Sequence, residues 1–179
     1  METATLAGGC FWCTEAIFKR LKGVEKIIPG YSGGSVGRPT YYNVSEGRSG
    51  HAEAIQIEFD PKVITYEKLL EVFFKLHDPT TLNQQGNDVG TQYRSVIFYH
   101  DERQKTAAEK IKKQIEKEKI YSKPLVTEVV AFEKFFKAED YHLDYYAKNP
   151  EQPYCRVIID PKITKLYKLF APEIKEKQN

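Results

Sequence analysis

Apolar extended runs alternate with helical patterns along the whole chain, and they do so in an irregular order. Extended runs are predicted over residues 3–7, 24–28, 51–59, 93–100 and 125–132. Helical patterns are predicted over residues 10–21, 66–77, 101–119, 133–148 and 161–170. No repeat or linker divides the 179 residues. The pattern predicts one α+β domain with a mixed sheet, spanning residues 1–179.

Composition excludes several classes of protein. The net charge of +2, with 29 % charged residues, provides no basic field for a nucleic-acid partner. The first seven residues lack the charged and apolar regions of a signal peptide, and no run approaches the roughly 20 apolar residues of a membrane helix. Three cysteines do not make a disulfide scaffold. We therefore expect a cytoplasmic protein without a membrane partner.

A cysteine stands where the first extended run meets the first helix. Gly8 and Gly9 precede Cys10, so the chain can turn sharply into the helix there. A thiol at a helix N-terminus faces free N–H groups, which favour the thiolate and predict a lowered pKa. Cys10 is therefore the candidate nucleophile, and a buried structural thiol is the alternative.

Cys10 and Cys13 form a Cys-x-x-Cys pair. This spacing allows a redox disulfide at a helix start, but Cys13 could equally pack beneath the helix. A structural zinc ion needs four ligands, and the sequence has no second ligand pair of suitable spacing. We therefore expect no metal site.

Residues 51–59 alternate between two faces. Glu53 shares its face with Ile55, Ile57 and Phe59, so a strand here places a carboxylate among apolar side chains. Loss of hydration should raise the pKa of Glu53 and leave it protonated near neutral pH, as a proton donor requires. The alternative is a solvated Glu53 at the strand edge beside His51.

Other features allow a functional and an ordinary interpretation. The glycine-rich residues 29–40 are expected to be irregular, and the polar loop 78–92 could order a pocket or lie on the surface. Phe11 and Trp12 could line an apolar pocket or belong to the core. The histidines of the helical patterns, His77 and His142, are expected at helix surfaces or caps, and the tyrosines of residues 141–146 are expected to pack.

Several blocks together resemble one known family. They are GCFW (9–12), GYSGG (30–34), PTY (39–41), GHAE (50–53), HDPT (77–80), GNDVGTQYRS (86–95), AEDYH (138–142), KNP (148–150) and YC (154–155). Their order and spread over nearly the whole chain resemble the A-type peptide-methionine (S)-S-oxide reductases.

The resemblance implies both a fold and a reaction. The fold would be a two-layer α+β sandwich, a mixed sheet with a ferredoxin-like core covered by helices. The enzyme would reduce the S epimer of methionine sulfoxide, free or in oxidised proteins and peptides. Cys10 would attack the sulfoxide sulfur and become a sulfenic acid, while Glu53 would act as the general acid on the oxygen.

The resemblance also implies roles for five further residues. Tyr41, Tyr93 and Asp88 would bind and polarise the oxygen, and Phe11 and Trp12 would form the pocket for the substrate methyl group. No cofactor is implied, and we expect a monomer.

Recycling is where the sequence departs from a common pattern of the family. A resolving thiol would attack the sulfenic acid, and thioredoxin would reduce the resulting disulfide. Cys155, on a tail from about residue 149, aligns with the resolving cysteine. It lacks the glycines that usually surround it, and Cys13 replaces a usual glycine. Cys155 is favoured, and Cys13 is the alternative.

Two other functions fit parts of the sequence. A general thiol-disulfide oxidoreductase would use Cys10 and Cys13 alone, and it leaves the blocks around Glu53, Asp88 and Tyr93 unexplained. A non-catalytic domain that binds methionine or oxidised peptides would require an unreactive Cys10. The density of ordered blocks favours the reductase over both.

Overall fold

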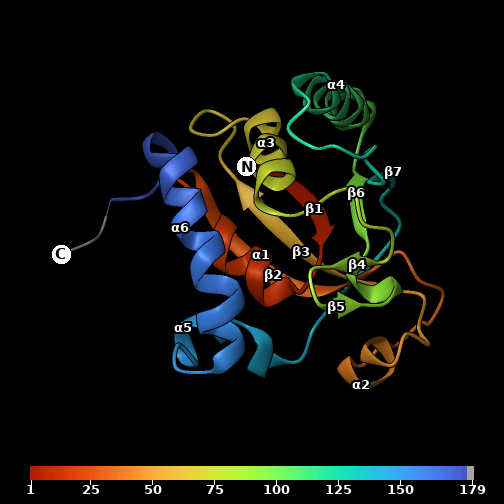
Figure 1. The fold of residues 1–179 in the computed structure, drawn as a ribbon. Coiled ribbons are helices and arrows are strands. Elements are labelled where there is room, and N and C mark those ends of the chain that lie inside the picture. Colours follow the sequence, from red (N-terminus) through yellow and green to blue (C-terminus); the bar gives the residue numbers. More distant parts are fainter. Residues whose placement is uncertain (177–179) are drawn as a thin grey trace.

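The computed structural model describes residues 1–176, and a six-stranded mixed sheet forms its centre (Figure 1). The predicted domain also includes residues 177–179, which lie outside the described part. The strands are Glu2–Gly8 (β1), Val24–Ser32 (β2), Ala52–Phe59 (β3), Ser95–Tyr99 (β6), Glu128–Ala131 (β7) and Phe135–Lys137 (β8). A separate hairpin pairs Gln84–Gln85 (β4) with Asp88–Val89 (β5).

The sheet has the order β7-β6-β1-β3-β2-β8. Only β6 and β7 run parallel; the other described neighbours are antiparallel. One helix connects β1 to β2 and another follows β3, so the four strands β6-β1-β3-β2 have ferredoxin-like topology. The predicted α+β fold with a mixed sheet and a ferredoxin-like core is confirmed.

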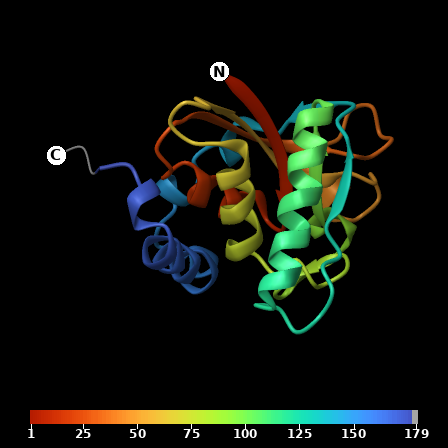
Figure 2. The same ribbon diagram turned by 90° about the horizontal axis from the view of Figure 1, so that it is seen from above.

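Helices cover one face of the sheet and its end. They are Phe11–Phe18 (α1), Tyr41–Ser45 (α2), Tyr66–Leu76 (α3), Glu102–Glu118 (α4), Tyr145–Lys148 (α5) and Asp160–Leu169 (α6), and a π-helical turn, Cys155–Ile159, runs directly into α6. Figure 2 shows α3 beside α4, with α6 beyond α3. α6 also contacts α1. The main core lies between these helices and the sheet.

The two faces of β3 separate as the alternation predicts. Ile55, Ile57 and Phe59 lie in the main core, whereas Ala52 and Ala54 belong to a smaller cluster that Phe132 and Phe135 cover. β3 is a central strand between β1 and β2, which explains why it is buried over most of its length. Glu53 lies opposite Tyr31 of β2 in this register.

Gly9 makes the turn from β1 into α1. Its φ of +93° lies in a region that side chains with a Cβ rarely adopt. A Cβ at this position would also lie 2.6 Å from Cγ of Gln85. The β4–β5 hairpin can therefore pack directly against the start of α1, next to Cys10.

The predicted helix over residues 133–148 is wrong. This segment contains β8, a 3-10 turn at Asp140–His142 and the short α5. β8 pairs with Gly30–Ser32 of β2, where a Cβ on Gly30 would lie 2.3 Å from the Phe136 carbonyl oxygen. The same pairing orders residues 29–32, which were expected to be irregular. Strand pairing has overridden the local helical preference.

The core consists mainly of aliphatic and aromatic residues. Its largest fully buried side chains are Tyr31, Phe11, Phe18, Phe59, Phe73, Phe74, Phe98, Leu6, Leu21, Ile55, Ile57 and Leu69. The only methionine of the chain, Met1, is 70 % exposed. Among the helices of residues 1–176, none has the length and apolar character needed to cross a bilayer.

Candidate active site

Cys10 is the N-cap of α1, and its side chain is 7 % exposed. Burial raises the pKa of the Cys10 thiol well above its ordinary value, and the Cys13 thiol and the Glu53 charge add to this rise. The expectation of a lowered pKa is therefore wrong for the free enzyme. One N–H group of the helix start, that of Phe11, donates to Glu53 rather than to sulfur.

Glu53 lies beneath the start of α1 and is 2 % exposed. Its Oε2 accepts the Phe11 backbone N–H at 3.0 Å. Burial raises the pKa of Glu53 to about 8, because this hydrogen bond only partly compensates for lost hydration, and Asp88 and Cys13 raise it further. The predicted burial of Glu53 is confirmed, the direction of its pKa agrees with the expectation, and the solvated alternative is wrong.

Tyr41, Tyr93 and Asp88 come from three separate segments around this pair. Tyr41 begins α2, Tyr93 ends the 3-10 turn Thr91–Tyr93, and Asp88 lies in β5. Burial and the charges of Glu53 and Cys10 raise the pKa of both tyrosines, so both remain hydrogen-bond donors. Asp88 Oδ2 accepts a hydrogen bond from Tyr154 at 2.6 Å.

Aromatic rings form a continuous cluster beside Cys10. Phe11 is fully buried, and its ring centroid lies 6.4 Å from that of Tyr41. Trp12 is partly exposed and stacks on Tyr145, with centroids 3.7 Å apart and planes 7° apart. Trp12 also lies 6.4 Å from Tyr41. Phe11 and Trp12 therefore share one aromatic cluster with a tyrosine of the site, and Tyr145 packs against it as expected.

All three cysteines are free thiols in one buried cluster. The hydrogen bond with the Cys10 thiol lowers the pKa of Cys13. When the pair of thiols loses its first proton, the thiolate that forms is stabilised by the remaining thiol. Cys155 is completely buried and begins the π-helical turn, rather than lying on an extended tail. Burial raises the pKa of Cys155.

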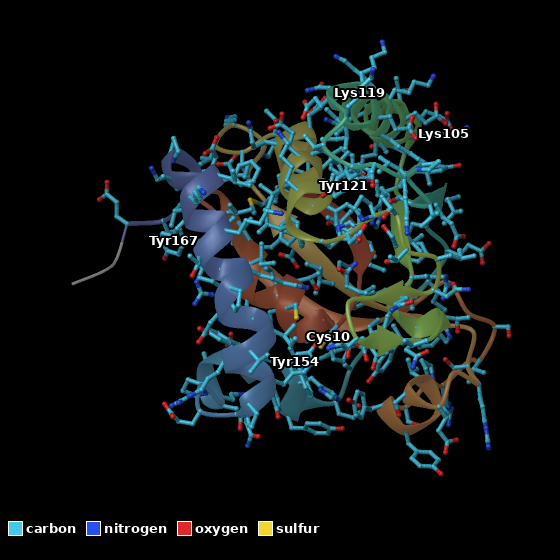
Figure 3. All side chains as sticks on the ribbon, in the orientation of Figure 1. Cys10, Lys105, Lys119, Tyr121, Tyr154 and Tyr167 are labelled. Atoms are coloured by element: carbon cyan, nitrogen blue, oxygen red, sulfur yellow. The ribbon has the colours of Figure 1, made fainter. Side chains whose placement is uncertain are left out.

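Tyr154 joins the cysteines to Asp88, and sequence reasoning gave it no role. Its hydroxyl lies 3.7 Å from Cys13 Sγ while donating to Asp88. Figure 3 shows Tyr154 next to Cys10. A groove of about 610 Å³ leads away from Asp88 and Tyr154, between the β4–β5 hairpin and the start of α6.

His77 is the C-cap of α3, as the cap expectation allows, whereas the expected surface or cap position of His142 is wrong. Both are buried: His77 contacts the Phe73 carbonyl and Ser95 Oγ, and His142 accepts from the Trp12 indole. Glu139, which accepts hydrogen bonds from Tyr31 and Tyr41, also received no role from the sequence. Both Glu139 and His142 belong to the AEDYH block (138–142), which was the sequence signal that could have identified them. Residues 1–176 contain no group of three or more His, Cys, Asp or Glu side chains arranged to hold a metal ion.

Comparison with known proteins identifies the family. The model of the peptide methionine sulfoxide reductase family matches residues 2–174. The chain belongs to this family. It is 59 % identical over 170 residues to the peptide methionine sulfoxide reductase MsrA of Sulfolobus acidocaldarius, covering 95 % of this chain and 96 % of that protein.

Solved structures agree with the family assignment. Reduced Mxr1 from Saccharomyces cerevisiae is 36 % identical and has a TM-score of 0.80, with 86 % of this chain and 88 % of that chain covered. Mxr1 in complex with Trx2 is 28 % identical and has a TM-score of 0.58, with 79 % of this chain and 84 % of that chain covered. As a member of the peptide methionine sulfoxide reductase family, the chain is an oxidoreductase that reduces methionine sulfoxide.

Proposed function

We propose that the enzyme reduces the S epimer of methionine sulfoxide through a sulfenic acid on Cys10. The Cys10 thiolate attacks the sulfoxide sulfur while the protonated Glu53 gives its proton to the oxygen, so the substrate sulfur transiently carries both Cys10 and a hydroxyl group. The hydroxyl group then moves to the Cys10 sulfur as the substrate's S–O bond and the transient S–S bond break. Methionine leaves, Cys10 is a sulfenic acid, and Glu53 is left ionised. Sulfur of the substrate is reduced and sulfur of Cys10 is oxidised.

The protonated Glu53 beside Cys10 carries this proposal. A sulfoxide oxygen is a poor leaving group until it accepts a proton, and a carboxylic acid with a pKa of about 8 still holds its proton at neutral pH. Deprotonation of the Cys10–Cys13 pair supplies the thiolate, because a proton can move along the hydrogen bond between the two thiols.

The residues around this pair support the remaining roles. Tyr41 and Tyr93 keep their phenolic protons and can donate to the sulfoxide oxygen, and Asp88 holds Tyr154 at the cysteine pair. Phe11 and Trp12 supply an apolar wall for the methyl group. We place the reaction in the cytoplasm, where thiols remain reduced.

For recycling we propose that both other cysteines act, in sequence. The Cys13 thiol attacks the Cys10 sulfenic acid, forming a disulfide and releasing water. Cys155 then attacks the Cys13 sulfur and expels Cys10 as thiolate, and a thioredoxin dithiol reduces the Cys13–Cys155 disulfide. The order is supported by the cluster that holds all three thiols, in which Cys10 and Cys13 shift each other's pKa and the charge of Cys13 raises the pKa of Cys155.

The substrate can be free or part of an oxidised protein or peptide. The groove that begins at Asp88 and Tyr154 offers room for residues flanking an oxidised methionine. The complex of Mxr1 with Trx2 supports thioredoxin as the reductant of this enzyme.

The main test measures methionine formed from each sulfoxide epimer, with dithiothreitol as reductant. Wild type should reduce only the S epimer, Cys10→Ser should be inactive, and Glu53→Gln should lose about 10²–10⁴-fold in the rate of the first turnover. Reduction of the R epimer, or an active Cys10→Ser variant, would refute the mechanism.

A second test separates the two recycling cysteines. With thioredoxin, Cys13→Ser should release one methionine per enzyme and then stop at the sulfenic acid. Cys155→Ser should release one methionine and accumulate a Cys10–Cys13 disulfide, identified by mass spectrometry of a tryptic digest. A directly formed Cys10–Cys155 disulfide in wild type would instead favour Cys155 as the first resolving thiol.

A further inference from the structure

We propose that His142 and Glu139 are positioning residues that hold the aromatic walls of the substrate pocket in place. The proposal rests on the proposed function, because it takes Phe11 and Trp12 to be those walls. Neither His142 nor Glu139 lies among the groups that transfer protons or electrons in the mechanism above.

His142 binds the indole of Trp12 directly. Trp12 Nε1 donates to His142 Nδ1 at 3.0 Å, across 130 residues of sequence. An indole N–H can only donate, so Nδ1 must carry the lone pair and the proton of a neutral imidazole must be on Nε2. His142 is fully buried, and burial lowers its pKa, which favours this neutral form.

Glu139 lies on the other side of the His142 ring. His142 Nε2 is 3.3 Å from Glu139 Oε2. The same carboxylate accepts the Tyr31 hydroxyl at 3.0 Å and, through Oε1, the Tyr41 backbone N–H at 2.9 Å. Glu139 therefore lies against His142 without a regular hydrogen bond to Nε2, and its own hydrogen bonds tie it to the first residue of α2 and to β2.

The His142 ring also packs against the walls themselves. Its centroid lies 4.9 Å from that of Phe11 and 4.5 Å from that of Tyr41. One imidazole thus packs at a tilt against the rings of Phe11 and Tyr41 and accepts the Trp12 indole N–H. If the indole hydrogen bond is lost, Trp12 can shift relative to Phe11 and Tyr41, and the fit to a methyl group should loosen.

Substitution of His142 can separate the hydrogen bond from packing. In His142→Asn, the amide oxygen can take the place of Nδ1 and still accept from the indole. In His142→Phe, a ring remains but no acceptor does. Glu139→Gln keeps the size and an acceptor for the Tyr41 N–H while removing the charge.

The chain contains one tryptophan, so its fluorescence reports on Trp12 alone. We expect His142→Phe to shift the emission maximum and to raise KM for methionine sulfoxide about tenfold. A tenfold rise corresponds to the loss of one buried hydrogen bond. The rate of the first turnover at saturating substrate should change less than about threefold, since no reacting group is altered. His142→Asn should lie closer to wild type in both measurements.

His100→Asn is the control for loss of a stacked histidine at an exposed position. His100 also stacks on an aromatic ring, at 4.2 Å from Phe132, and hydrogen-bonds Thr5, but it lies at the far end of β6. We expect its substitution to leave Trp12 emission and KM at wild-type values. A shift equal to that of His142→Phe would mean that loss of stability is the cause, and would overturn the proposal.

Coupling to Trp12 gives the decisive result. In a Trp12→Phe background, the KM difference between His142→Asn and His142→Phe should be smaller than with Trp12 present, because the indole donor is absent. An unchanged emission and KM in His142→Phe would overturn the proposal, as would a fall in the first-turnover rate without a change in KM. A Trp12→Phe variant with wild-type KM would refute the proposal that Trp12 is a wall of the methyl pocket. Wild-type emission in His142→Phe would refute only the positioning role of His142.

Discussion

At the scale of single residues, burial and hydrogen bonding oppose each other beneath α1. Glu53 gains one backbone hydrogen bond from Phe11 but loses almost all contact with water. Burial dominates, because one N–H group replaces only a fraction of the hydration shell of a carboxylate. The result is an acid that stays protonated under conditions in which an exposed glutamate would be ionised.

This raised pKa predicts a trade-off between stability and activity. An unfolded chain gives Glu53 the ordinary glutamate pKa of about 4.5, and burial raises this pKa to about 8 in the fold. The folded state therefore loses stability as the pH rises through this window. Glu53→Gln removes the titration, so the variant should gain thermal stability relative to wild type at pH 8 and little at pH 4, while losing turnover.

Differential scanning calorimetry of both proteins at the two pH values checks this prediction. An equal difference in Tm at pH 4 and pH 8 would contradict it, because the effect must follow the ionisation of Glu53.

Lys162 of α6 should tune the reactivity of Cys13. Both residues line one small cavity with His77, and the positive charge of Lys162 lowers the pKa of Cys13. Lys162→Met should therefore slow alkylation of Cys13 at pH 7, by roughly threefold. Iodoacetamide reaction rates in a Cys10→Ser, Cys155→Ser background measure Cys13 alone.

The matched control for this charge is Lys165→Met. Lys165 lies one turn further along α6 and is exposed. Equal slowing by both substitutions would show that the general charge of the helix matters, rather than the position of Lys162.

At the scale of elements, the sequence predicted those parts whose pattern is local. The alternation around Glu53 predicts a strand, and β3 lies there. The glycines before Cys10 predict a turn into a helix, and α1 begins there. The Thr65 side chain caps α3 in the same way.

The missed features depend on partners far away in the sequence. β8 forms because it pairs with the edge of β2. His142 binds the indole of Trp12, which is 130 residues away in the sequence. Tyr154 likewise meets Asp88 across 66 residues. No local pattern records such pairings, so residues 133–148 were predicted as a helix and these side chains received no role.

The loop before α2 predicts contrasting effects for two glycines. A Cβ on Gly34 would lie 2.4 Å from the His51 backbone nitrogen, whereas a Cβ on Gly37 would meet nothing within 4 Å. Gly34→Ala should therefore destabilise the enzyme by about 1–3 kcal/mol and raise KM, because the loop leads to Tyr41. Gly37→Ala should be neutral in urea unfolding and in turnover. Equal unfolding midpoints for both variants would refute this packing argument.

At the scale of the whole molecule, the most exposed apolar side chains come from several different elements. The most exposed ones include Tyr42 on α2, Leu82 before the hairpin and Val157 in the π-helical turn. Scattered residues of this kind do not form an interface. We predict a monomer, with a mass of 20.7 kDa by light scattering after gel filtration. A mass of twice this value would contradict the prediction.

The distribution of sulfur in the fold has a consequence for the enzyme under oxidant. Oxidation turns a methionine side chain polar, and in a packed interior it breaks the fit between neighbours. This core is made of hydrocarbon and aromatic rings, and the lone thioether is at the exposed start of the chain. Oxidising conditions that generate its substrate therefore find no methionine in the main core to damage.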